Sequence, residues 1–343
     1  MFRAGSKIRV QSIASRYAQS VRFASFKLAE IPTLEALAAE QSGFSGLFSK
    51  QVLQELWFKR GHDLTTQVNT HLNELDTSSF DESGFNLKEV ISSTTNKPQF
   101  YDLHKAASYL YNLQFFFENI KPVQQVRPGN EVAKVGSGAI LETPRDTFAN
   151  IPKDEEFVAW ITDSFGSVDE FRTLLLNSGR GIKGDGTVWL AAVSGVSQDF
   201  TLGMDPSRVK YQNLAVVNTY NGGILNDGDR AGQMKRMKSL MEMRKAKEAK
   251  ENKTTEEVAE ISSIDEELKQ LSLGNVEDAE YEVAFHNKSL LPLLAIDVSP
   301  SAYLLDYGVY GKDRYLENAW ECIDWDVVIS RMPARHKQAL DLF

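Results

Sequence analysis

Histidine is the residue type in this chain best suited to bind a redox metal, and the spacing of the histidines argues against such a site. A metal that cycles between two oxidation states needs imidazole ligands as well as carboxylates, because carboxylates alone suit hard cations. The 343 residues include five His. His62 and His71 stand nine residues apart in an expected helix, a spacing of two and a half turns that points them to opposite sides. We therefore expect no pair of histidine ligands on that helix.

Two further stretches have the composition of chemical sites but are interpreted as structural. The segment 179–186, GRGIKGDG, is rich in glycine like a phosphate loop, yet it lacks the Gly-Lys-Ser/Thr ending that brings a cation and a hydroxyl to phosphate and magnesium. We expect it to form a turn before a strand. Cys322 is the only cysteine, which excludes an intrachain disulfide. Beside Trp320 it is expected to be a small core residue.

The hydrophobic pattern predicts a helical hairpin followed by a mixed α+β region. A first long helix is expected over 51–73 and a second over 103–119, joined by a polar, turn-rich link at 76–98. The first helix should bury one face, made of Leu53, Trp57, Leu64, Val68 and Leu72. The later elements expected are helices near 152–165 and at 168–177 with Ser167 as N-cap, strands at 188–193, 214–217 and 293–298, and a helical region from Ala302 onward.

Residues 1–29 have the composition of a mitochondrial transit peptide. Before the first acidic residue, Glu30, the segment holds six Arg or Lys and five Ser. A segment that is amphipathic, rich in arginine and serine and free of acidic residues is typical of a mitochondrial transit peptide. Residues 22–25 offer a processing site for its removal. The alternative is a basic disordered tail. Removal would move the formal net charge from −9 to about −15, because six basic residues would leave with no acidic one.

The acidic balance limits the partners that are expected. Nucleic-acid binding usually draws on a dense basic surface, which this chain lacks overall, so protein partners should dominate and RNA contact should be local. No apolar run approaches the roughly 18 residues that a membrane span requires.

A segment at about 224–287 divides by charge and is interpreted as an insertion. Lys235–Lys253 holds eight basic residues against three acidic ones, whereas Glu256–Glu282 holds ten acidic residues against Lys269. The basic half could form a helix that presents charge to RNA phosphate or to an acidic protein. The alternative is that the segment is a solvated, partly disordered loop. The candidate contact residues are Lys235, Arg236, Lys238, Arg244, Lys245 and Lys247.

The C-terminal block 292–307, PLLAIDVSPSAYLLDY, resembles the motif L-x-[LI]-D-V-W-E-H-A-Y-Y-L-D-Y of the iron/manganese superoxide dismutases. Three earlier stretches resemble other motifs of that family in the same order: NLQFFFENI at 112–120, GDGTVWL at 184–190 and LAVVNTYNG at 214–222. The resemblance covers about 45–335. It implies an α+β fold with an N-terminal helical hairpin and a C-terminal domain in which helices flank a small antiparallel sheet.

The same resemblance implies that the metal ligands are missing. Of the family's three His and one Asp, the Asp is kept as Asp297, while two His positions are Leu113 and Ser301. The third falls in the first helix, in a register that places it at Leu56, Trp57 or Lys59. The Gln that the manganese enzymes place near metal-bound solvent is Gly222. We therefore expect no metal, no other cofactor and no catalytic residue.

Two of these positions also have structural interpretations from the residues alone. Leu113 shares one apolar helix face with residues spaced by three and four, namely Ala106, Leu110 and Phe117, so it should be packed core. Asp297 precedes a helix start in which Ser299 would be the N-cap and Pro300 the first helical residue.

In the dismutases the Trp-Glu-His-Ala-Tyr-Tyr segment reaches across to the neighbouring subunit. Here it reads Ser-Pro-Ser-Ala-Tyr-Leu at 299–304, without the Glu and the His. The resemblance implies a two-chain surface that has lost its reciprocal Glu–His bridges. Candidate interface residues are Ser299, Tyr303 and Tyr307, and a divergent, related chain is the expected partner.

Together these features resemble the dismutase-related proteins of the fungal mitochondrial ribosomal small subunit. That resemblance implies a scaffold in the mitochondrial matrix, paired with a related chain and touching other small-subunit proteins and local rRNA. The expected division is a transit peptide at 1–29, a helical hairpin domain at 30–130 and an α+β domain at 131–343. Two alternatives remain: a free matrix adaptor, and an active dismutase in which His62, His71 or His104 rebuilds a site around Asp297.

Overall fold

The computed structural model describes residues 26–74, 86–95, 97–141, 143, 145, 147–194, 211–225, 290–333 and 335. The expected transit peptide therefore lies outside the described residues up to position 25, as does nearly all of the expected insertion, including the six candidate basic residues. Within the described ranges, no helix is long and apolar enough to cross a membrane. The domain division and the insertion stay predictions.

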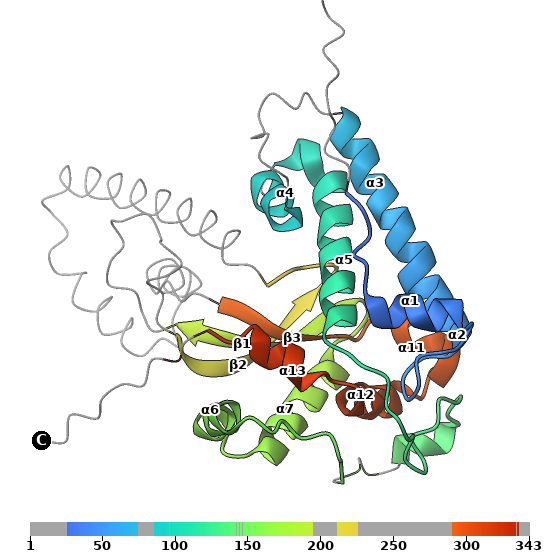
Figure 1. Cartoon of the computed structure of the whole chain (residues 1–343), viewed down its shortest axis with the longest axis vertical. Helices are drawn as coiled ribbons and strands as arrows, with labels where there is room; N and C mark the ends of the chain where they lie inside the picture. Colours follow the sequence, from blue (N-terminus) through green and yellow to red (C-terminus); the bar gives the residue numbers. More distant parts are fainter. Residues whose placement is uncertain are drawn as a thin grey trace, which may run out of the picture.

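The expected helical hairpin is confirmed (Figure 1). Its first arm runs without a break through α2 (Lys50–Leu53), the π-helical turn η2 (Gln54–Lys59) and α3 (Arg60–Glu74), and its second arm is α5 (Tyr101–Glu118). The predicted apolar face of the first arm is buried throughout, as is Leu113 on the facing arm. A π-helical turn fits one extra residue into the turn, so it changes which side chains of the following helix face the core.

The link between the arms differs from the prediction. Within the segment expected to be turn-rich lies α4 (Leu87–Thr94), whose N-cap Asn86 accepts a hydrogen bond from the amide of Lys88. Val90 and Ile91 are fully buried, and α4 packs on α5. An amphipathic helix of only two turns leaves too short a periodic pattern to separate it from polar loop sequence. The shorter elements of this half are α1 (Pro32–Ala39) and η4 (Pro98–Phe100).

The second half is built on an antiparallel sheet with strand order β2-β1-β3. The strands are β1 (Gly186–Ser194), β2 (Tyr211–Tyr220) and β3 (Leu290–Asp297). The first two extend past both ends of their predicted ranges, whereas β3 begins before its predicted start and ends one residue before its predicted end. Successive side chains of a strand point to opposite faces. Trp189 of β1 therefore meets Phe115 of α5 on one face, while Asn218, paired with Val188, bonds Ser178 of α7 on the other.

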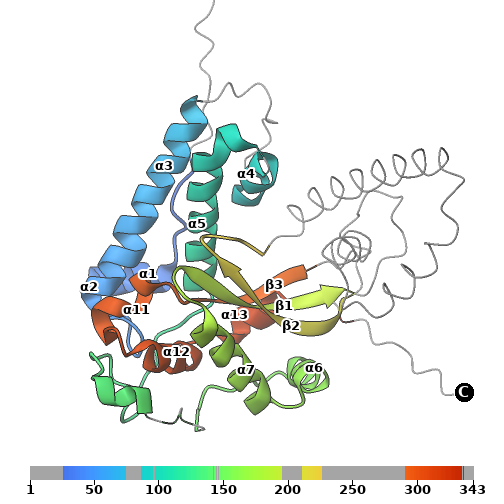
Figure 2. The same ribbon diagram turned by 180° about the vertical axis from the view of Figure 1, so that it is seen from behind.

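Two helices, α6 (Glu155–Phe165) and α7 (Val168–Gly181), cover that second face, and Figure 2 shows them across the sheet from α5. Ser167 caps α7 as predicted, because its hydroxyl accepts from the amide of Glu170 at 3.1 Å. The chain closes with α11 (Pro300–Tyr307), α12 (Lys312–Glu321) and α13 (Trp325–Ser330), and a short 3₁₀ segment, η5 (Ser137–Leu141), precedes α6.

The two halves share one contiguous apolar core. Buried hydrogen bonds also connect them. The Tyr307 hydroxyl donates to the carbonyl of Leu47 at 2.6 Å. The Asn119 side chain, just past α5, both donates to and accepts from the backbone of Ala295 in β3, at 3.0 Å each way. Cys322 lies in this core, as expected, and burial raises the pKa of its thiol to about 12.

Candidate functional site

Asp297, expected from the resemblance to be the one ligand position that is kept, ends β3 with its side chain buried. It is 8% exposed. Its Oδ1 accepts a hydrogen bond from the amide of Ser299 at 2.9 Å. Burial raises the pKa of this carboxyl, whereas the charge of Arg60 and the hydrogen bonds from Ser299 act in the opposite direction. Burial therefore disfavours the ionised form of the Asp297 carboxyl, and the charge of Arg60 favours it.

Arg60 is the first residue of α3. Arg60 and Asp297 line the same small cavity, whose volume is about 10 Å³. The Arg60 Nη1 donates to the hydroxyl of Ser301 at 3.0 Å, and its guanidinium carbon lies 5.5 Å from the centre of the Tyr109 ring. The π-helical turn ends just before this residue. A guanidinium and the carboxyl group of Asp297 therefore line the same cavity, between groups that come from both halves of the molecule.

The structure gathers the expected vestigial positions around this arginine. Leu113 and Gly222 line the cavity together with Asp297, and Ser301 reaches it through Arg60. Gly222 has φ of +76°, and a Cβ there would lie 3.0 Å from ring atoms of Tyr109. A larger residue at this position would need both a strained backbone and a displaced ring.

The residues present do not fit a transition metal. Leu113 is 3% exposed and carries no donor atom. In the three possible registers of the first helix, Leu56 and Trp57 are buried in the core, while Lys59 pairs with Glu55 at 2.7 Å on the exposed face. Among the described residues there is no group of three or more His, Cys, Asp or Glu that could hold an ion. A guanidinium beside the one carboxylate would also repel a cation.

The histidines considered for a rebuilt site do not converge on Asp297. His62 is exposed on α3. His104 approaches Thr94 of α4, with its Nδ1 3.0 Å from the threonine hydroxyl. His71 also lies on α3, and none of the three histidines lines the cavity at Asp297.

The three residues expected at a two-chain surface differ in exposure. Ser299 and Tyr307 are buried, while Tyr303 is partly buried against the core. Ser299 does precede Pro300 at the start of α11, but its side chain makes no cap. Ser299 is thus the N-cap residue of α11 as predicted, while its hydroxyl accepts a hydrogen bond from the amide of Gly186 in β1 at 3.3 Å.

The exposed part of this region lies one turn further on. Four large apolar residues of α11 and the turn after it are exposed: Leu304 (41%), Leu305 (43%), Val309 (75%) and Tyr310 (45%). The sequence signal for Leu304 and Leu305 was an apolar run in a short helix. Its period could not show which of the apolar side chains face solvent, since the helix has only two turns.

Comparisons with known proteins agree with this architecture. Residues 234–331 match the family model described as iron/manganese superoxide dismutases, C-terminal domain. The chain is also 38% identical over 56 residues to the "Small ribosomal subunit protein mS42" of Schizosaccharomyces pombe, a stretch that covers 16% of this chain and 26% of that protein. The chain thus matches about a quarter of the length of that relative. The dismutase-like C-terminal region predicted from the sequence is confirmed. The match begins inside the segment interpreted as an insertion.

Proposed function

We propose that this chain is a structural component of the small subunit of the mitochondrial ribosome, a dismutase-like scaffold without redox chemistry. The observation that carries the proposal is the 38% identity over 56 residues with a protein named as a small ribosomal subunit protein. The acid-free, arginine- and serine-rich residues 1–29 support a mitochondrial address.

The geometry at Asp297 supports the non-enzymatic part of the proposal. Dismutation would need a metal with an open coordination position. Here a leucine, a serine and a glycine stand at three of the family's positions, and Arg60 supplies the positive charge that faces the carboxylate. The charge of Arg60 would offset part of the free-energy cost of burying this carboxylate.

As a scaffold, the chain would pair with a related dismutase-like chain through α11. The four exposed apolar residues at 304, 305, 309 and 310 would supply the contact area, together with the partly buried Tyr303 of the same helix. Buried Ser299 and Tyr307 would hold the helix from within. Local contact with rRNA or with neighbouring proteins would fall to the basic residues of 235–247.

Sedimentation tests the ribosomal assignment. Mitochondrial lysate at high magnesium would be run on a sucrose gradient and this chain followed by mass spectrometry. We expect co-sedimentation with the small subunit, and a shift to the top of the gradient after EDTA or RNase. A small soluble species under all conditions would refute the assignment and favour a free matrix adaptor, and bound iron or manganese in stoichiometric amount would favour a dismutase.

The pairing surface has its own test. Leu304→Asp places a charge on the exposed apolar surface of α11, whereas Leu174→Asp does the same at a 47%-exposed leucine of α7 and serves as the matched control. Tagged chains would be purified from mitochondria and their partners quantified. We expect the first variant to lose a dismutase-like partner that the second retains. Equal recovery from both would place the pairing surface elsewhere.

A further inference from the structure

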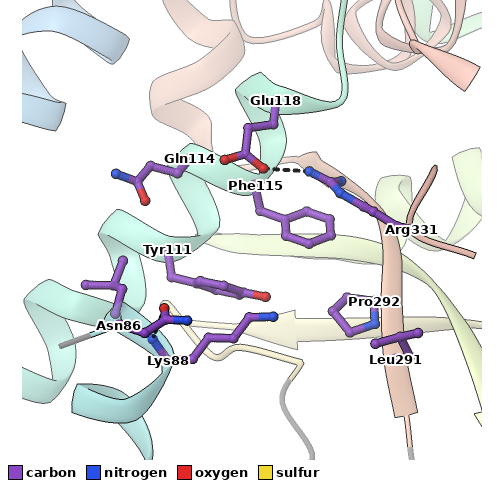
Figure 3. Close-up of a pocket in the computed structure, with 10 residues that line it drawn as sticks. Asn86, Lys88, Tyr111, Gln114, Phe115, Glu118, Leu291, Pro292 and Arg331 are labelled. Atoms are coloured by element: carbon purple, nitrogen blue, oxygen red, sulfur yellow. Dashed lines mark hydrogen bonds and ion pairs between the residues drawn. The ribbon is translucent and has the colours of Figure 1, made fainter. Parts of the chain in front are cut away.

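A cavity of about 370 Å³ opens between α4, α5 and β3, away from the Asp297 site (Figure 3). Its wall combines two cations, Lys88 of α4 and Arg331 just after α13, with the phenol of Tyr111 from α5. Leu291 and Pro292 of the edge strand β3 supply an apolar side. The cavity therefore joins positive charge to apolar surface.

The Tyr111 hydroxyl is an unused hydrogen-bond donor in this wall. Tyr111 is 6% exposed, and its hydroxyl has no hydrogen-bond partner among the residues that the structure describes. Burial raises the pKa of this phenol, so it stays protonated and able to donate. Figure 3 shows the hydroxyl directed into the cavity beside the Lys88 ammonium. A buried hydroxyl without a partner costs free energy that a bound acceptor would recover.

The two cations are not equivalent. Arg331 is already engaged, because it pairs with Glu118 at 2.7 Å, donates to the carbonyl of Leu293 at 3.2 Å and lies 3.8 Å from the centre of the Phe115 ring. Its charge is thus fixed in place and largely balanced by Glu118.

Lys88 has no acidic partner within ion-pair distance in the described parts of the chain. Its ammonium lies 5.6 Å from the centre of the Tyr111 ring. Partial burial and the charge of Arg331 lower its pKa, while Glu118 acts more weakly in the opposite direction. The lysine sits in the first turn of α4, at the positive end of the helix dipole, which also favours an anion.

We propose that this cavity binds a single carboxylate carried on an apolar stem, supplied by an acidic side chain of another polypeptide. Lys88 would pair with the carboxylate, Tyr111 would donate a hydrogen bond to it, and Leu291 and Pro292 would contact the stem. One uncompensated cation suits a monoanion, whereas a phosphate dianion would bring a second charge close to Glu118. The inference goes beyond the proposed function and holds whether or not the chain is ribosomal.

The test uses the purified full chain and two blocked dipeptides, acetyl-Leu-Glu-amide and acetyl-Leu-Gln-amide, with binding followed by ligand-observed NMR. Lys88→Met removes the charge and keeps most of the stem, and Tyr111→Phe removes only the hydroxyl. Lys105→Met is the matched control, because Lys105 also lies over a tyrosine ring, that of Tyr101 at 5.9 Å, but outside the cavity. Urea unfolding would establish that all three variants fold.

We expect saturable binding of the glutamyl peptide and none of the glutaminyl peptide. Lys88→Met and Tyr111→Phe should each weaken binding about tenfold, the loss of one hydrogen bond to a charged group, and Lys105→Met should leave it unchanged. Equal binding of the two peptides, or a Lys88→Met variant that binds as the unmodified chain does, would overturn the proposal. Displacement of the peptide by lower concentrations of inorganic phosphate would also overturn it and assign the site to a phosphate-bearing ligand.

Discussion

The charge of Arg60 should contribute measurably to stability, and replacing it tests whether a guanidinium has taken over the electrostatic role of a metal. Arg60→Met keeps an unbranched stem beside Tyr109 and removes the charge that faces Asp297. Breaking a fully buried ion pair costs about 3–5 kcal/mol. Arg60 is only partly buried, and its bond to Ser301 is at the surface, so solvent screening brings the expected cost to about 2 kcal/mol.

The dependence on pH follows from the direction of the Asp297 shift. The folded pKa is raised, so the stability gained by keeping this carboxyl protonated is fully present below its ordinary value and is lost as pH rises through the folded value. Removing Arg60 should raise the folded pKa further. The deficit of Arg60→Met should therefore be largest above the folded pKa of Asp297 and shrink as pH falls below it, where the folded carboxyl is protonated with or without Arg60.

Urea unfolding at pH 7.5 and pH 4.5 provides the measurement. A cost of about 2 kcal/mol corresponds to a midpoint shift of about 0.7 M if the m value is about 3 kcal/mol/M. Lys59→Met is the matched control, because this neighbouring lysine pairs with Glu55 on the exposed face and should leave the midpoint unchanged.

Asp297→Asn completes a double-mutant cycle. Its amide oxygen still accepts from the Ser299 amide, but the charge is gone. In that background Arg60→Met should cost about 1 kcal/mol less than in the unmodified chain. The reasoning would be refuted by a cost of Arg60→Met that is the same at both pH values and in both backgrounds, since the arginine would then act only by packing.

Three further outcomes follow from the buried polar groups. Asn119→Ala leaves both backbone groups of Ala295 without their partner on the sheet edge, and should lower the free energy of unfolding by about 2–4 kcal/mol in a urea titration. Tyr307→Phe should lower the free energy of unfolding by about 1–3 kcal/mol in the same assay, because the Tyr307 hydroxyl is hydrogen-bonded to the Leu47 carbonyl. Tyr111→Phe should leave the free energy of unfolding unchanged, because the Tyr111 hydroxyl has no hydrogen-bond partner among the described residues. Equal costs for the two substitutions would contradict this difference in hydrogen bonding. Cys322, with a buried thiol whose pKa is raised to about 12, should resist a thiol reagent at pH 8 until the chain unfolds, and rapid labelling of folded protein would show that this part of the core opens.

Much of the architecture was readable from the sequence because it is encoded locally. Apolar residues at helical spacing predicted both arms of the hairpin, and short apolar runs predicted all three strands of the described sheet. The Ser167 cap depends only on residues within one turn, and it forms as expected. The absence of His at position 113 is likewise a fact of the sequence, and burial of Leu113 followed from its spacing.

The sequence alone did not determine which residues meet across the fold. Nothing near Arg60 in the chain indicates that it faces Asp297, because a π-helical turn shifts the register of the first arm and 237 residues separate the two in sequence. The Ser299 hydroxyl turned to β1 instead of capping α11, since tertiary packing offered another hydrogen-bond partner. Local sequence thus predicted the hairpin arms and the strands of the described sheet, but not α4. Only the tertiary structure decided which cation balances the remaining carboxylate, because that choice depends on burial and on contacts between distant segments.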